Sequence, residues 1–217
     1  MMLDKITRLL AGAVLTSSMF ATAIPAPAFA QQAPMLVPEL GIAKRPVRPV
    51  NLPCCRCLDG KTTTVNASTG TAPWNVAFGS SAAQPVIPAS NVSWTPVPPG
   101  QWVGPAGNAV LGDYTYTMPF QVPKCVIPMQ VTISGKFAAD NTGKLYIGGN
   151  LVKASQGTPN YGFLPGSVTP FTWTGVLTPG PHAITMVVTN TSGPTGVVVA
   201  ATITVTCPDL KDGANPN

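Results

Sequence analysis

The chain has 217 residues, of which 25 are proline and 21 are glycine, and only 9% of its residues are charged. The formal net charge of +5 is small, and the basic residues form no stripe with aromatic side chains between them, so a nucleic-acid-binding protein is not expected. Pro, Gly or Thr interrupts every apolar run beyond the first 30 residues, which argues against a transmembrane helix there.

The first 30 residues have the pattern of an export signal. Lys5 and Arg8 precede an apolar stretch over residues 9–20, and Ala28-Phe29-Ala30 is a small-x-small cleavage site. The apolar stretch is too short to span a bilayer, so we expect cleavage after Ala30 rather than a membrane anchor. The protein is therefore predicted to be secreted, periplasmic or held at the cell surface.

The rest of the chain divides into an arm, a domain and a tail. Residues 31–60 are rich in proline, which favours an extended, partly polyproline-like arm. Residues 61–207 are long enough for one sizeable core and are assigned to a single domain. Residues 208–217 are polar and are expected to form a flexible tail.

Short β-prone runs separated by turn residues fill the domain. Val131, Ile133 and Phe137 alternate with polar residues, which is the period of a strand with one buried face. Segments of this kind, without any apolar stripe of helical period, indicate an all-β antiparallel sandwich or jelly roll. Strands are expected near residues 62–65, 74–78, 92–94, 101–103, 114–122, 131–137, 145–147, 168–174, 183–189 and 196–206.

Several positions within these strands carry additional information. Pro119 suggests an edge strand or a bulge, because proline cannot donate a ladder hydrogen bond. Residues 140–143 form a turn cluster, and residues 148–150, Gly-Gly-Asn, can form a tight hairpin. The run at 196–206 is apolar on both faces over part of its length, which predicts a central strand.

All five cysteines follow the export signal, in a compartment where disulfides form. If the strand after Cys125 runs antiparallel to the strand before Cys207, pairing Val131 with Ile203 or a close neighbour, these two cysteines meet, so we predict a Cys125–Cys207 disulfide. The arm carries three more cysteines. A disulfide from one of them to the domain or to a second chain is favoured over zinc, which needs four ligands. These three are Cys54, Cys55 and Cys57.

The order of motifs resembles a known family. The motifs are Trp102-Val-Gly-Pro, Gly112-Asp-Tyr-Thr-Tyr, Gly135-Lys-Phe-Ala-Ala-Asp-Asn, Leu145-Tyr-Ile-Gly-Gly-Asn, Phe171-Thr-Trp and Leu177-Thr-Pro-Gly-Pro-His. Together they are similar to the galactose-binding-like β-sandwich found in exported bacterial proteins and beside glycoside hydrolases, over roughly residues 70 to 207. The resemblance implies a jelly roll that often binds carbohydrate without catalysis. The arm with its cysteine cluster is a departure from that pattern.

The residues that an enzyme would need are sparse. His182 is the single histidine, and no nucleophile-elbow motif accompanies it. Glycoside hydrolysis needs two opposed carboxylates, and only Asp113 and Asp140 lie inside the sandwich region. No catalytic residue is therefore assigned, and a glycan-active hydrolase is the least supported reading.

Loop aromatic side chains are the best candidates for a ligand site. Trp74 and Trp173 alternate with apolar neighbours and are expected in the core, whereas an exposed aromatic platform in a loop could stack on a sugar ring. The candidate ligand-binding residues are Trp94, Asn160, Tyr161 and His182.

Asp140 and Asn141 allow two interpretations. They resemble a turn that could hold one structural calcium ion, but calcium needs six or more oxygen ligands and a plain turn is favoured. No other cofactor is expected. The predicted function is non-catalytic binding of carbohydrate or another extracellular polymer. The alternative is a structural or adhesive surface protein whose arm contacts other chains.

Overall fold

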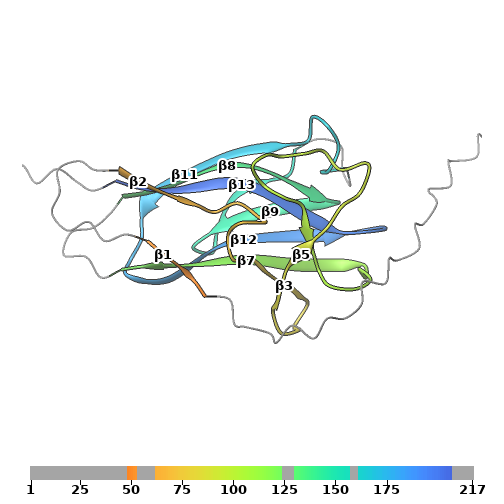
Figure 1. Ribbon diagram of the computed structural model, residues 1–217, viewed down its shortest axis with the longest axis horizontal. Coiled ribbons are helices and arrows are strands. Elements are labelled where there is room, and N and C mark those ends of the chain that lie inside the picture. The colour runs from red at the N-terminus through yellow and green to blue at the C-terminus, as the bar shows by residue number, and fades with distance from the viewer. Residues whose placement is uncertain (1–47, 53–61, 124–129, 157–160, 207–217) are drawn as a thin grey trace, which may run out of the picture. The chain divides into compact units, whose positions relative to one another are not determined.

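The computed structural model describes residues 48–52, 62–123, 130–156 and 161–206. Within these ranges the regular structure consists of strands, and no helix is present that could cross a membrane. Two sheets, antiparallel apart from one short strand, pack face to face, which confirms the predicted all-β sandwich (Figure 1). Most of the proline-rich arm lies outside the described residues.

Sheet A has seven strands. Its order is β10 (Asn150–Ala154), β9 (Thr142–Ile147), β12 (Gly180–Asn190), β7 (Gly112–Val122), β3 (Asn75–Phe78) and β4 (Gln84–Pro85). The short strand β1 (Val50–Asn51), within the proline-rich segment 31–60, pairs parallel with β7. β12 and β7 pair along eleven residues each, from Gly180 opposite Val122 to Asn190 opposite Gly112, and form the centre of this sheet.

Sheet B has six strands. Its order is β11 (Thr169–Val176), β8 (Gln130–Asp140), β13 (Gly196–Thr206), β6 (Val103–Gly104) and β5 (Ile87–Pro88), and β2 (Thr62–Asn66) pairs with the second half of β13. β13 has partners on both sides, as its apolar composition predicts. Apolar side chains occur on both faces of its first half, because the main core covers one face and Trp94, Val97 and Trp102 cover Val198 and Ala200 on the other.

The core lies between the sheets and follows from strand alternation. On β7 the buried residues alternate with partly exposed ones and are Tyr114, Tyr116, Met118, Phe120 and Val122. Val131 and Ile133 on β8 and the alternate residues of β13 meet them from sheet B. Trp74 is only 2% exposed and donates its indole N–H to the Ala67 carbonyl, which confirms its core placement.

The long-range pairing that was predicted for the cysteines is present in the described strands. β8 and β13 are antiparallel, with Gln130 opposite Thr206 and Ile133 opposite Ile203. Val131 therefore faces Val205, two residues from the expected partner Ile203. Cys125 and Cys207, like Cys54, Cys55 and Cys57, lie outside the described residues, so the disulfides stay predictions.

Three local predictions differ from the structure. Residues 92–94 form a turn and loop rather than a strand. The predicted turn cluster at residues 140–143 is mostly strand, because β8 ends at Asp140 in sheet B and β9 begins at Thr142 in sheet A. Only Asn141 lies between these strands, where the chain changes sheets. Pro119 lies on the interior strand β7, at a position where no strand pairs with β7 on one of its two sides. β3 pairs up to Thr117 and β1 begins at Phe120, so no hydrogen bond is lost on that side.

The hairpin at residues 148–150 is confirmed. Gly148 and Gly149 have φ angles of +56° and +81°, and Asn150 pairs with Ile147 across the turn. Side chains disfavour this backbone region, so the two glycines make the tight connection between β9 and β10 possible.

Candidate functional site

A loop over residues 89–102 packs on the outer face of sheet B. The outward side chains beneath it are small: Ala138 on β8, and Val198 and Ala200 on β13. Trp94, Val97 and Trp102 fill the space above them and form a second apolar cluster, separate from the main core. Larger side chains at these positions would occupy the space that the two indole rings fill.

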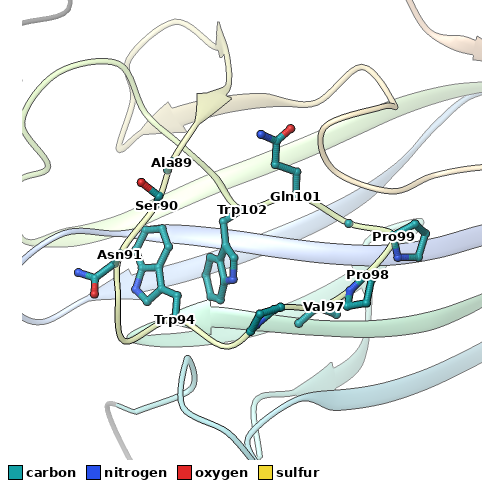
Figure 2. Close-up of a pocket in the computed structure, with 11 residues that line it drawn as sticks. Ala89, Ser90, Asn91, Trp94, Val97, Pro98, Pro99, Gln101 and Trp102 are labelled. Atoms are coloured by element: carbon teal, nitrogen blue, oxygen red, sulfur yellow. The ribbon is translucent and has the colours of Figure 1, made fainter.

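The two tryptophans form a stacked pair (Figure 2). Their ring centroids are 4.4 Å apart with an interplanar angle of 27°, and each residue is 8% exposed. Trp94 Nε1 donates to Asp140 Oδ2 at 2.7 Å, and Trp102 Nε1 donates to the Thr95 carbonyl at 2.8 Å. Both indole N–H groups are therefore used inside the protein, and only part of the ring surface is available to a ligand.

A hollow of about 360 Å³ opens beside this pair. Its wall consists of the tryptophans, the proline-rich turn at residues 96–100 and the polar side chains of Ser90, Asn91 and Gln101 (Figure 2). None of the residues that line it is Asp, Glu, Lys, Arg or His. A neutral hollow with aromatic, aliphatic and amide groups is suited to a neutral polar ligand rather than to an ion.

Hydrogen bonds to neighbouring segments hold the loop in place. The Gln101 amide donates to the Thr69 carbonyl at 3.0 Å, and the Thr95 amide donates to the Phe163 carbonyl at 2.9 Å. The Ala89 amide donates to the Trp102 carbonyl at 2.9 Å and joins the two ends of the loop. Within the loop, Asn91 Oδ1 accepts from the Ser93 amide at 2.9 Å. The proline rings restrict the rest of the backbone, so the hollow is largely preformed.

Asp140 is the buried acid behind Trp94. It is 3% exposed, and its Oδ1 atom has no hydrogen-bond partner among the described residues. Burial raises the pKa of this carboxyl to about 7, and the hydrogen bond from Trp94 only partly opposes that effect. A buried carboxyl with this pKa is substantially protonated at neutral pH.

Tyr116 lies close to Asp140 in the core. Its hydroxyl is fully buried and makes no well-formed hydrogen bond within the described part of the chain. Burial and the nearby Tyr114 and Asp140 raise its pKa well above the usual value, while the neighbouring Thr195 hydroxyl lowers it slightly. Thr195 instead donates to the Asp140 carbonyl oxygen at 2.7 Å. Two enclosed polar atoms, the Tyr116 hydroxyl and Asp140 Oδ1, thus have no hydrogen-bond partner within the described ranges.

The predicted ligand-binding residues are not brought together. Trp94 lines the hollow, but it is buried and is not the exposed platform that was expected. Tyr161 is 49% exposed, packs on Phe163 and does not line the hollow. His182 packs on Phe120 and bonds the Thr178 carbonyl at 2.7 Å, near the start of β12, away from the end that neighbours Asn141. Asn160 lies outside the described residues.

Sequence reasoning missed Ser90, Asn91, Gln101 and Trp102 as possible ligand contacts. The available signal was the segment Pro-Val-Pro-Pro-Gly at residues 96–100, placed between two tryptophans. Such a segment is stiff and turns sharply, so it can hold the two rings together.

The side chains of Asp140 and Asn141 hold neighbouring segments. Asp140 binds Trp94, and Asn141 Oδ1 accepts from the amides of Thr191 and Ser192 at 2.7 and 3.2 Å. Among the described residues, no three His, Cys, Asp or Glu side chains gather in a group that could hold a metal ion. A calcium ion at Asp140 and Asn141 stays a prediction.

The two carboxylates considered for hydrolysis do not share a site. Asp113 is exposed at the start of β7 and accepts a hydrogen bond from the Thr189 hydroxyl at 2.6 Å. Asp140 is enclosed, and neither residue lines the hollow. The described geometry therefore gives no pair of carboxylates facing one ligand, as glycoside hydrolysis requires.

Comparison with known proteins gives distant structural matches only. No family model and no curated protein matches the sequence. A GH2 β-galacturonidase from Eisenbergiella tayi is similar at 14% identity and a TM-score of 0.36, over 68% of this chain and 25% of that one. A family 35 carbohydrate-binding module from Clostridium thermocellum is similar at 12% identity and a TM-score of 0.35, over 65% of this chain and 97% of the module.

The chain thus spans about a quarter of the length of the galacturonidase. These TM-scores are too low for the matches to indicate a ligand or an activity. The architecture itself rests on the strand pairing and the packed core of the structure.

Proposed function

We propose that this protein is an exported, non-catalytic binding module that takes a neutral carbohydrate into the hollow beside Trp94 and Trp102. The observation that carries the proposal is the hollow itself, which is preformed and uncharged and combines tryptophan and proline surface with amide and hydroxyl groups. The apolar face of a sugar ring packs on aromatic or proline surface. Asn91 and Gln101 can donate and accept hydrogen bonds with its hydroxyl groups.

Filling the hollow with a charged side chain tests this proposal. Ser90 is exposed and lines the hollow, so Ser90→Arg places a long cationic group in it. Ser93 is an exposed residue of the same loop that does not line the hollow, so Ser93→Arg is the matched control. We expect pull-down on insoluble cellulose, xylan, mannan and chitin to retain the wild type and Ser93→Arg on at least one polymer, and to lose Ser90→Arg.

Substitution of the polar wall gives a second measurement. Gln101→Ala removes a neutral amide at an exposed position and should weaken binding about fivefold to tenfold, the effect of one lost hydrogen bond. As a control for folding, circular dichroism should show the same strand spectrum for each variant as for the wild type. Equal retention of Ser90→Arg and the wild type on every polymer would rule out this hollow as the site.

A structural or adhesive role is the second candidate, and one observation favours it. Val110 and Leu111, which precede β7, are 52% and 65% exposed, and Phe78 beside Tyr114 is 38% exposed. Exposed apolar side chains in one region can mark a protein contact. Failure to bind any saccharide, together with oligomers that disappear on reduction, would favour this role, with Cys54, Cys55 or Cys57 as the proposed link between chains.

A further inference from the structure

The uncovered half of the outer face of sheet B carries a regular array of small polar side chains. The residues that point away from the core on β2, β13, β8 and β11 lie in register across the sheet, because their neighbours Val65, Ile203, Ile133 and Trp173 pack into or against the core. We call these residues the hydroxyl face. Its rows are Thr62, Thr206, Gln130 and Val176, then Thr64, Thr204, Thr132 and Thr174, then Asn66, Thr202, Ser134 and Thr172.

The composition of this face is one-sided. Nine of its twelve side chains carry a hydroxyl group, two more are amides, and none is charged. All twelve are exposed or partly exposed. The hydroxyls of Thr132 and Thr174 lie 3.0 Å apart, so hydroxyl groups of neighbouring strands approach within hydrogen-bond distance.

The hydroxyl face begins where the loop that forms the hollow ends. Along β13 the outward residues are Val198 and Ala200, which the loop covers, and then Thr202, which is exposed. Successive outward residues on a strand are about 7 Å apart. On β8 the boundary residue is Lys136, opposite Ala200, whose ammonium group can donate hydrogen bonds to a neutral ligand. The hollow and the hydroxyl face therefore belong to the same side of the molecule.

We propose that the hydroxyl face extends the binding surface, so that the ligand is a neutral polysaccharide chain of several sugar units rather than a single sugar. This inference rests on the proposed function. Neighbouring strands are about 4.8 Å apart, a spacing comparable with one sugar unit of an extended chain, so a chain crossing the strands meets a hydroxyl group from each. Each exposed hydrogen bond is weak, so affinity comes from their repetition along the chain.

An uncharged face also restricts the chemistry of the partner. An acidic polysaccharide would require several lysine or arginine side chains opposite its carboxylate groups. The twelve positions supply none, and Lys136 at the boundary is a single cation. The hollow at the other end of the same face is also uncharged and therefore also favours a neutral ligand.

The dependence of affinity on ligand length tests the proposal. Calorimetric titration of the full chain would use cello-, xylo-, manno- and chito-oligosaccharides from dimers through hexamers. The variant Thr132→Val with Thr204→Val removes two directly paired hydroxyls and keeps their shape and strand preference. Its matched control is Thr117→Val with Thr185→Val, a directly paired couple on the outer face of sheet A.

We expect affinity to rise from dimer to hexamer in at least one series. The Thr132/Thr204 variant should bind the hexamer about tenfold more weakly, while its dimer affinity and the behaviour of the control variant stay unchanged. Equal affinity for dimer and hexamer, or an equal loss in the control variant, would overturn the inference and leave the hollow as the site. Length dependence that survives in Ser90→Arg would instead overturn the proposed hollow and support the hydroxyl face. Absence of binding in every series would overturn both.

Discussion

Asp140 makes the stability of this protein depend on pH. The side chain is 3% exposed, one oxygen accepts from Trp94, and the other has no hydrogen-bond partner within the described residues. Burial raises its pKa from 3.8 to about 7. Between these two values the folded protein keeps a proton that the unfolded chain releases, so the free energy of unfolding falls as pH rises.

The size of this effect follows from the shift. A change from 3.8 to about 7 corresponds to about 4 kcal/mol, at about 1.4 kcal/mol for each pKa unit. Hydration and relaxation of the surroundings screen a buried charge, which reduces the expected loss to about 2 kcal/mol. The stability is fully present below about pH 4, and its loss is complete above about pH 7.

Replacement by asparagine removes this pH dependence. Asp140→Asn keeps an oxygen acceptor for Trp94 and cannot ionise. The free energy of unfolding of this variant should therefore not fall in the same way as pH rises. Urea unfolding at about pH 5 and about pH 8 measures the change in the wild type and in each variant. Asp113→Asn is the control, because Asp113 is exposed and its variant should keep the wild-type slope. If the wild type and Asp140→Asn lose stability in parallel across this range, the assignment of the proton to Asp140 is wrong.

Two further predictions concern the sandwich itself. In Gly135→Ala, the new Cβ would lie against the Ala200 carbonyl oxygen and 2.7 Å from Ala201 Cα, both of them backbone atoms of β13. Thermal unfolding should therefore show a loss of stability of about 2 kcal/mol or more. The neighbouring variant Ser134→Ala should lose little stability. A non-reducing peptide map should recover Cys125 and Cys207 in one linked pair, because Gln130 and Thr206 are paired residues at the ends of β8 and β13; two free thiols at these positions would contradict this pairing.

Alternation of apolar and polar residues was sufficient to predict the class of the fold and much of its core. The predicted strands at residues 62–65, 114–122 and 196–206 are present, and the last of these is central in its sheet. These features depend on short-range pattern, since a strand that buries one face must alternate whatever its partners are. The antiparallel partnership of β8 and β13 was also predicted, because Cys125 and Cys207 flank these two strands in the sequence.

Only part of the candidate site could be predicted from the sequence. Trp94 was chosen as a loop aromatic, but its depth depends on Ala138, Val198 and Ala200, which lie far away in sequence and leave room for two indole rings. The burial of Asp140 also depends on segments that are distant in sequence. Its sequence context is typical of a surface turn, yet the chain changes sheets there and encloses the carboxyl beneath Trp94.

The sequence by itself determined the position of the long strands and which face of each is apolar, because that information is local. Only the tertiary structure decided which outward faces are covered, which stay open, and which polar groups lose contact with water. A loop that packs on one half of sheet B creates the hollow, and the half that it leaves open becomes the hydroxyl face. Both outcomes depend on contacts between distant segments, which no local pattern records.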